Sequence, residues 1–167
     1  KIEDANRRYC HFGLIPVSAS GAKVSNYYSM KNYKHAKIVL ATGVAITGST
    51  AVTIERAKTV AAGSTEVWTK WDTVFVNANV AAYNGEDASE TKDLTKTAVS
   101  SYTKTLDAVN TMWVIEFDAI ELDYDGGGFD CFGVKFAAGL TTTVISCYVE
   151  LSGARFSGDT PPDGRTN

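Results

Sequence analysis

Hydrophobic and polar residues alternate along most of this chain, which is the pattern of half-buried β-strands. The clearest run is "MWVIEFDA", in which Trp113, Ile115 and Phe117 share one face while Glu116 and Asp118 share the other. Further strand-like runs, rich in Val, Ile, Thr and aromatic residues, occupy 36–43, 49–60, 65–71, 72–80, 129–136 and 143–151. These segments predict a protein built of β-strands.

Short turn signals separate the runs, among them "AAGST", "DGGGFD" and "AAGLTT". The strongest helical candidate, "GEDASETKDLTK", is polar on every side and is better explained as a loop. The sequence thus predicts an all-β fold, an antiparallel β-sandwich of jelly-roll-like type. We expect an extended N-terminal arm at 1–11, a single β-sandwich domain at 12–156 and a flexible C-terminal tail at 157–167.

The composition is that of one ordinary globular domain. The 167 residues are 44% hydrophobic and 21% charged, with a formal net charge of −3. This slightly acidic balance gives no reason to expect nucleic acid or an anionic membrane as a partner. No apolar run reaches the roughly 18 residues that a membrane helix needs. We therefore expect no nucleic acid and no membrane among the partners.

Cysteine and histidine spacing offers no catalytic or metal signature. Cys10, Cys131 and Cys147 are an odd number without CxxC spacing, so reduced thiols are favoured over a Cys131–Cys147 bridge. A Cys10–His11 dyad is disfavoured because neighbours in an extended segment point to opposite faces. The GxSxG, HExxH, phosphate-loop and dinucleotide motifs are also missing. We expect no cofactor and no catalytic residue.

The densest group of acidic residues surrounds three glycines in "ELDYDGGGFDCFGV". An EF-hand calcium loop beginning at Asp123 fails, because its fifth position is Gly127 and its twelfth, Val134, has no ligating oxygen. A looser calcium site formed by Asp123, Asp125 and Asp130 stays open as an alternative. A turn explains more residues, since Asp-Gly favours hairpins and short acidic side chains bond nearby backbone N–H groups. We therefore predict a strand-connecting turn here.

Two pairs of carboxylates have the spacing that places both side chains on one face of a strand. Glu116 with Asp118, or Glu121 with Asp123, could in principle serve a glycoside hydrolase, whose two carboxylates lie roughly 5–10 Å apart. Such sites are usually flanked by aromatic rings that stack on sugars, and Trp113 lies on the opposite parity from Glu116. Alternating acidic residues equally describe a solvated sheet face. We favour the solvated face.

Three runs of the chain carry a family resemblance: "SMKNYKHAKIVLATGVAITGSTAVTIERAKTVAAGS", "NTMWVIEFDAIELDYDGGGFDCFGVKFA" and "VISCYVELSGARF". In order, they contain the phrase Met30–Tyr33 before an apolar strand and a "TG" turn, then "ERAK", "MWVIEFDA" and "GFDC". In this order and spacing the chain resembles small virion structural proteins of tailed bacteriophages, the head proteins described as capsid-decoration or cement proteins. The resemblance covers about 12–156.

This resemblance implies a non-enzymatic, all-β protein that binds and stabilises the outer surface of the capsid shell. The implied partner is the shell of major capsid protein, and the implied location is the exterior of the virion after assembly in the host cytoplasm. We expect a homo-oligomer, with a trimer as the first expectation. The N-terminal arm and the C-terminal tail are the kinds of segment that reach onto a neighbouring subunit.

The alternative from another class is a carbohydrate- or host-surface-binding β-sandwich module of a phage fibre or spike. Its stacking platform would consist of Trp68, Trp71 and Tyr83, because apolar sugar faces pack on aromatic rings. Core packing is the favoured interpretation of Trp71, and an edge position is the favoured interpretation of Trp68.

Overall fold

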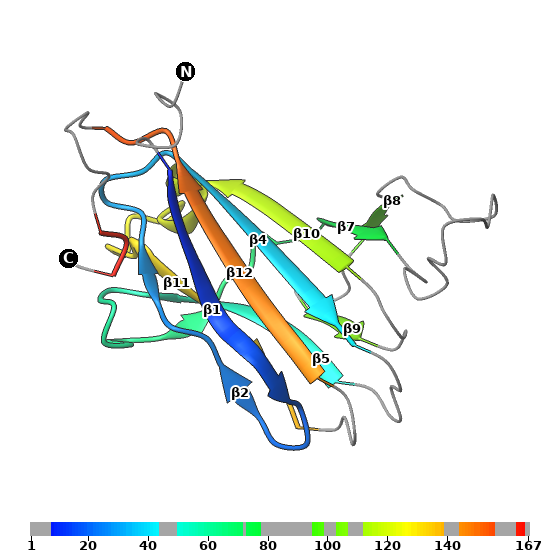
Figure 1. Ribbon diagram of the computed structural model, residues 1–167. Helices are drawn as coiled ribbons and strands as arrows, with labels where there is room; N and C mark the ends of the chain where they lie inside the picture. Colours follow the sequence, from blue (N-terminus) through cyan, green and yellow to red (C-terminus); the bar gives the residue numbers. More distant parts are fainter. Residues whose placement is uncertain are drawn as a thin grey trace.

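The computed structural model describes residues 8–43, 50–71, 73–77, 95–98, 103–106, 112–138, 144–155 and 163–165. Within these ranges the chain forms two packed antiparallel sheets, so the prediction of an all-β sandwich is confirmed (Figure 1). The elements are β1 (Tyr9–Ser18), β2 (Lys23–Val24), β3 (Tyr28–Ser29), β4 (His35–Thr42), β5 (Thr50–Ala57), β6 (Glu66–Val67), β7 (Thr73–Asn77), β8 (Thr95–Ala98), β9 (Thr103–Leu106), β10 (Met112–Asp118), α1 (Ala119–Leu122), β11 (Cys131–Phe136) and β12 (Val144–Ser152).

The strand order is that of a jelly roll. In the front sheet of Figure 1 the order is β1-β12-β4-β10-β7-β8, so the last strand lies between the first and the fourth. In the back sheet β11 lies between β2 and β5, β3 also pairs with β11, and both β6 and β9 pair with β5. Early and late strands therefore alternate across each sheet, and the chain crosses repeatedly from one sheet to the other.

The core lies between the sheets and follows the alternation in the sequence. Phe117 of β10 packs against Trp68 and, edge to face, against Phe132 of β11, with ring centroids 4.6 and 5.0 Å apart. Burial along β4 and β12 changes at every residue, as expected for strands with one face on the core. Other core residues include Ile38, Leu40, Val52, Ile54, Trp113, Ile115, Val134, Phe136, Ile145, Val149 and Leu151.

Both ends of the described chain contact the sandwich. Strand β1 begins at Tyr9, which pairs with Leu151, so the last residues of the predicted 1–11 arm belong to the front sheet. Near the other end, the amide of Ser29 donates to the carbonyl of Gly164 over 2.6 Å. Gly164 is buried where a Cβ would lie 2.6 Å from Leu151 and 3.0 Å from Tyr9. Within the tail predicted for 157–167, Gly164 is therefore buried against the front sheet while Asp163 and Arg165 are exposed; residues 1–7 lie outside the described ranges.

Among the described residues there is no helix with the length and hydrophobicity required to cross a membrane.

Candidate binding surfaces

The acidic, glycine-rich segment is a turn built by its own side chains. It starts at α1, where Glu121 accepts a hydrogen bond from the Asp118 amide over 2.8 Å, one half of a capping box. The Asp123 carboxylate then accepts from the amides of Gly128 at 2.7 Å and Phe129 at 3.2 Å. Gly128 has φ +78°, a conformation that glycine reaches without steric cost. The predicted strand-connecting turn is confirmed, but it joins β10 of the front sheet to β11 of the back sheet and does not close a hairpin.

A buried arginine fastens this turn to the back sheet. Arg56 of β5 is only 3% exposed, and its Nη1 donates to the carbonyl of Leu122 at 2.8 Å and to Asp125 at 3.0 Å. Its Nη2 donates to the other Asp125 oxygen, and its Nε donates to Glu66 at 2.6 Å. We call Arg56, Glu66, Leu122 and Asp125 the arginine lock. A bidentate, charge-assisted pair of this kind fixes orientation as well as distance.

Aromatic rings and electrostatics complete the arginine lock. The guanidinium carbon of Arg56 lies 4.1 Å from the ring centroid of Phe129 and 4.7 Å from that of Tyr124, within cation–π range. Hydrogen bonds from Arg56 lower the pKa of Asp125 below its ordinary value. Hydrogen bonding to Asp125 and Glu66 outweighs burial and raises the pKa of Arg56, which stays charged in the fold.

In the structure, the three aspartates of the calcium alternative bond other groups of the protein. Both oxygens of Asp125 are bonded to Arg56, while Asp123 is bonded to backbone amides. Asp130 accepts a hydrogen bond from the Cys131 thiol at 3.0 Å. In the part of the chain that the structure describes, no three His, Cys, Asp or Glu side chains are grouped to hold a metal ion. The three aspartates serve the local fold.

Sequence reasoning did not single out Arg56, although the sequence contained a signal. Arg56 follows Val52 and Ile54 at intervals of two, so a charged residue falls on the apolar face of β5. A charge at such a position needs a partner, because a buried unpaired charge is very costly. That requirement points toward a carboxylate elsewhere in the chain, but not to a particular one.

The arginine lock fixes the backbone beside a large apolar side chain that is exposed to solvent. Ile120 of α1 is 82% exposed. The backbone around it is fixed, because the indole N–H of Trp68 donates to the Glu121 carbonyl at 2.9 Å and Arg56 donates to the Leu122 carbonyl. Beside Ile120 lies a hollow of about 430 Å³, lined by Met30, Lys31, Ala119, Ile120, Asp123, Gly128, Phe129, Asp130 and Arg155. We call this region the α1 surface.

The two carboxylate pairs lie in different surroundings. Glu116 and Asp118 are exposed on the outer face of the front sheet, where Lys37 lies 3.3 Å from Glu116 and His35 lies 3.1 Å from Asp118. The solvated-face interpretation of this pair is confirmed. Glu121 and Asp123 bond backbone amides instead, as described above.

The histidine and cysteine predictions agree with the structure where it describes them. His11 Nδ1 lies 2.9 Å from the Tyr28 hydroxyl, while Cys10 is exposed. All three cysteines are thiols rather than disulfides. Cys131 and Cys147 are buried, and burial raises the pKa of Cys147 to about 12, so this thiol is not a nucleophile near neutral pH.

Two of the three aromatic residues in the platform of the carbohydrate-binding alternative are not on the surface. Trp68 and Trp71 are each 2% exposed and belong to the core. Core packing of Trp71 is confirmed, whereas the edge position expected for Trp68 is wrong. The indole N–H of Trp68 donates to the Glu121 carbonyl, so the side chain is buried with its polar group hydrogen-bonded. Tyr83 lies outside the described residues.

A second exposed apolar region covers one half of the outer face of the front sheet. Phe12 and Ile15 of β1 are 52% and 70% exposed, and Val144 of β12 is exposed beside them. Phe12, Tyr148, Val39 and Val114 are successive cross-strand neighbours from β1 to β10. We call this half the front apolar surface; its members are Phe12, Ile15, Val39, Ala41, Met112, Val144 and Tyr148, whereas Val114 is buried. Apolar patches of this kind mark interaction sites.

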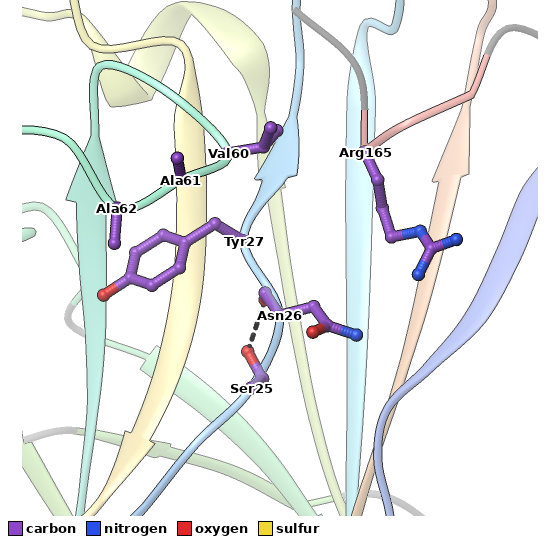
Figure 2. Close-up of a pocket in the computed structure, with 7 residues that line it drawn as sticks. All are labelled: Ser25, Asn26, Tyr27, Val60, Ala61, Ala62 and Arg165. Carbon is purple, nitrogen blue, oxygen red and sulfur yellow. Dashed lines mark hydrogen bonds between the residues drawn. The ribbon is translucent and has the colours of Figure 1, made fainter.

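A further hollow of about 350 Å³ lies over the back sheet and is lined by residues of three segments (Figure 2). In Figure 2 the ring of Tyr27 points toward Ala62, with Arg165 on the other side. Ala62 has φ +61°, a strained conformation for a residue with a Cβ. The Tyr27 hydroxyl already donates to Glu55 over 2.6 Å, and Glu55 also accepts from Lys135. These bonds stabilise the wall of the hollow.

No protein-family model matches the chain, and no curated protein sequence matches it. Among solved structures, the chain is similar to the crystal structure of SPBc2 prophage-derived protein YomS, with 9% sequence identity and a TM-score of 0.46. The match covers 87% of this chain and 93% of that chain. A likeness this distant carries no argument about activity or partners.

Proposed function

We propose that this chain is a non-enzymatic structural protein of a phage virion, which binds the outer surface of the capsid shell as a homo-oligomer and stabilises it. The family resemblance in the sequence supports the proposal. The jelly-roll fold agrees with it, because this fold is common among viral capsid and lectin domains, although a fold alone does not define a function. The observation that carries the proposal is the rigid exposure of Ile120 on the α1 surface.

An exposed isoleucine on a fixed backbone is suited to insertion into a partner. Burying such a side chain contributes roughly 1.5–3 kcal/mol. The arginine lock and the Trp68 bond hold the turn before binding, so little conformational entropy is lost when the partner arrives. The exposed basic residues Lys31 and Arg155 flank the same hollow. The acidic residues Asp123 and Asp130 line it as well, so the complementary site on the shell is an apolar pocket with a rim of mixed charge.

The symmetry of the shell explains how a single exposed side chain per copy can be sufficient for stable binding. A capsid offers many equivalent sites, and an oligomer that reaches several of them at once gains avidity without any new contact. A contact of a few kcal/mol per copy then gives stable decoration. The same anchor in a single copy would bind only weakly.

The test is a co-sedimentation assay with purified shells that lack this chain. We expect Ile120→Asp to weaken binding to the shells at least tenfold, because a carboxylate cannot enter an apolar pocket without losing its hydration. The melting temperature should stay almost unchanged, since the side chain is 82% exposed. The matched control is Val24→Asp, which adds the same charge at an exposed apolar residue of the back sheet.

Equal binding of Ile120→Asp, Val24→Asp and the parent protein would show that the α1 surface does not contact the shell. If the parent protein itself shows no saturable binding to the shells, the proposed function is wrong.

A further inference from the structure

The outer face of the front sheet has a polar half as well as its apolar half, and the polar half is ordered by charge. Arg8 lies 2.7 Å from Glu150 of β12, and Lys37 of β4 lies 3.3 Å from Glu116 of β10. Glu150, Lys37 and Glu116 are cross-strand neighbours in one row. Read from Arg8, which directly precedes β1, across β12, β4 and β10, the charges alternate as positive, negative, positive and negative. The row therefore carries no net charge.

Such an alternating row is complementary to itself when reversed. Rotation by 180° about an axis parallel to the strands, between β12 and β4, places β1 over the partner's β10 and β12 over the partner's β4. Arg8 then faces the partner's Glu116, and Glu150 faces the partner's Lys37. The same rotation keeps positions along the strands, so the front apolar surface faces its own copy. Rotation about an axis across the strands would instead set apolar residues over charged ones.

We propose that a second copy of this chain docks on the front sheet through this two-fold axis, burying the two front apolar surfaces against each other. An isologous contact of this kind closes with two copies, and closed two-fold dimers are the commonest homo-oligomers. The building unit is then a dimer, in place of the trimer that was the first expectation from the sequence. The inference rests on the homo-oligomer of the proposed function and is independent of shell binding through the α1 surface.

The size of the face agrees with a stable contact. Four neighbouring strands spaced about 4.8 Å apart, with residues rising about 3.3 Å each, form a patch of roughly 20 by 25 Å. That is about 500 Å² on each partner, which is below the ~800 Å² of a standard interface but reaches the ~1,000 Å² in total that a specific interface should clear. Facing sheets pack about 10 Å apart with their strands within about 30° of parallel, which the proposed axis permits.

Two other occupants fit the charges less well. An anionic membrane requires an excess of basic groups, whereas the polar row pairs each basic group with an acidic one. The apolar surface of a different protein would gain nothing from the alternation of signs. A second copy uses both halves of the face at once.

The first measurement is the mass of the purified protein by sedimentation equilibrium without capsids. We expect twice the chain mass of 17.9 kDa. Val39→Asp, near the centre of the face, should raise the dimer dissociation constant at least tenfold, while Val24→Asp on the back sheet should leave it unchanged. If Val39→Asp does not fold, Phe12→Asp replaces it, because Phe12 is 52% exposed. A monomer, a trimer, or a dimer insensitive to these variants would overturn the proposal.

The second measurement identifies the axis by cross-linking. In the proposed dimer, the exposed Cys10 of β1 lies over the partner's β10, in the row of Glu116. Glu116→Cys treated with a short bismaleimide, whose reach matches the ~10 Å spacing of packed sheets, should give a covalent dimer. The parent protein and Lys135→Cys, on the back sheet, should stay uncross-linked. Equal cross-linking of all three proteins, or none in Glu116→Cys, would overturn the axis.

Measuring dimerisation and shell binding separately distinguishes failure of this inference from failure of the proposed function. A protein that dimerises but does not bind shells retains the inference and refutes the proposed function. A protein that binds shells as a monomer refutes this inference and retains shell binding as the function. Binding of vesicles made of anionic lipid, abolished by Val39→Asp, would assign the face to a membrane and overturn the proposal.

Discussion

Two pairs of carboxylates in this protein have the same spacing in sequence and opposite roles. Asp123 and Asp125 lie in the turn after α1, where Asp125 bonds the buried Arg56 and Asp123 bonds backbone amides. Glu116 and Asp118 lie on the outer face of the front sheet, where their cationic partners share the same exposed surface. The first pair organises a turn within the fold, and the second covers a solvated surface.

The two pairs differ in how deeply their cationic partners are buried, and not in the exposure of the acids themselves. The Asp125 side chain is as exposed as that of Glu116, at 42% against 39%, yet Arg56 is 3% exposed while Lys37 is 39% exposed. A buried guanidinium depends on its carboxylates, because water cannot replace them. An exposed ammonium exchanges its carboxylate for water at little cost. Short acidic motifs therefore acquire a structural role when the fold supplies a buried cation.

The largest expected effect comes from removing that buried cation. Arg56→Met should lower the free energy of unfolding by about 3 kcal/mol, because the Leu122 carbonyl loses its donor and the turn loses its attachment to β5. Urea titration followed by tryptophan fluorescence measures this change. A loss below about 1 kcal/mol would show that the arginine lock contributes no more than an exposed ion pair.

Lowering the pH should weaken the arginine lock, and this effect on stability should be smaller than that of removing Arg56. The pKa of Asp125 is below its ordinary value because Arg56 donates hydrogen bonds to the carboxylate. The resulting stabilisation is present above about pH 4, where the unfolded aspartate is ionised, and is lost as the pH falls through the folded pKa. Asp125→Asn should therefore melt below the parent protein at pH 7, and the gap should narrow toward about pH 2.

Circular dichroism at a series of pH values measures the difference in melting temperature between Asp125→Asn and the parent protein. The control is Glu116→Gln, whose melting temperature should equal that of the parent protein at each pH. A gap that stays constant from neutral pH to acid would mean that Asp125 acts through shape alone and not through its charge.

The smallest expected effect is on the outer face of the front sheet. Lys37→Met removes the cation beside Glu116, and we expect the free energy of unfolding to change by less than about 0.5 kcal/mol, because both side chains are solvated. The measurement is made on the monomer at high dilution, so that self-association does not contribute. A loss as large as that of Arg56→Met would erase the difference between the two regions.

Local pattern was sufficient to predict the fold class, although it did not mark β1 as a strand. The period-two alternation in β10 and β12 correctly assigns which residues face the core, and the "DGGG" segment correctly indicates a turn. These features depend on residues close together in the chain, so the sequence displays them directly.

The arginine lock and the position of Trp68 depend on distant partners, and there sequence reasoning stopped. Arg56 and Asp125 are 69 residues apart, and Trp68 and Glu121 are 53 apart. Parity marks Arg56 as unusual, but only the crossing of strands between the two sheets brings its carboxylate near. The front apolar surface needed the register of four strands before Phe12, Tyr148, Val39 and Val114 formed one row.

Strand β1 forms one end of the front sheet, and its irregular register has a consequence for behaviour at high concentration. Its pairing with β12 shifts between Phe12 and Leu14 and again between Leu14 and Val17, and Pro16 has no N–H to donate. A strand from another molecule therefore cannot hydrogen-bond along β1 without interruption. Copies at high concentration can still meet through side chains, but β1 does not offer them an unbroken edge along which to join into fibrils.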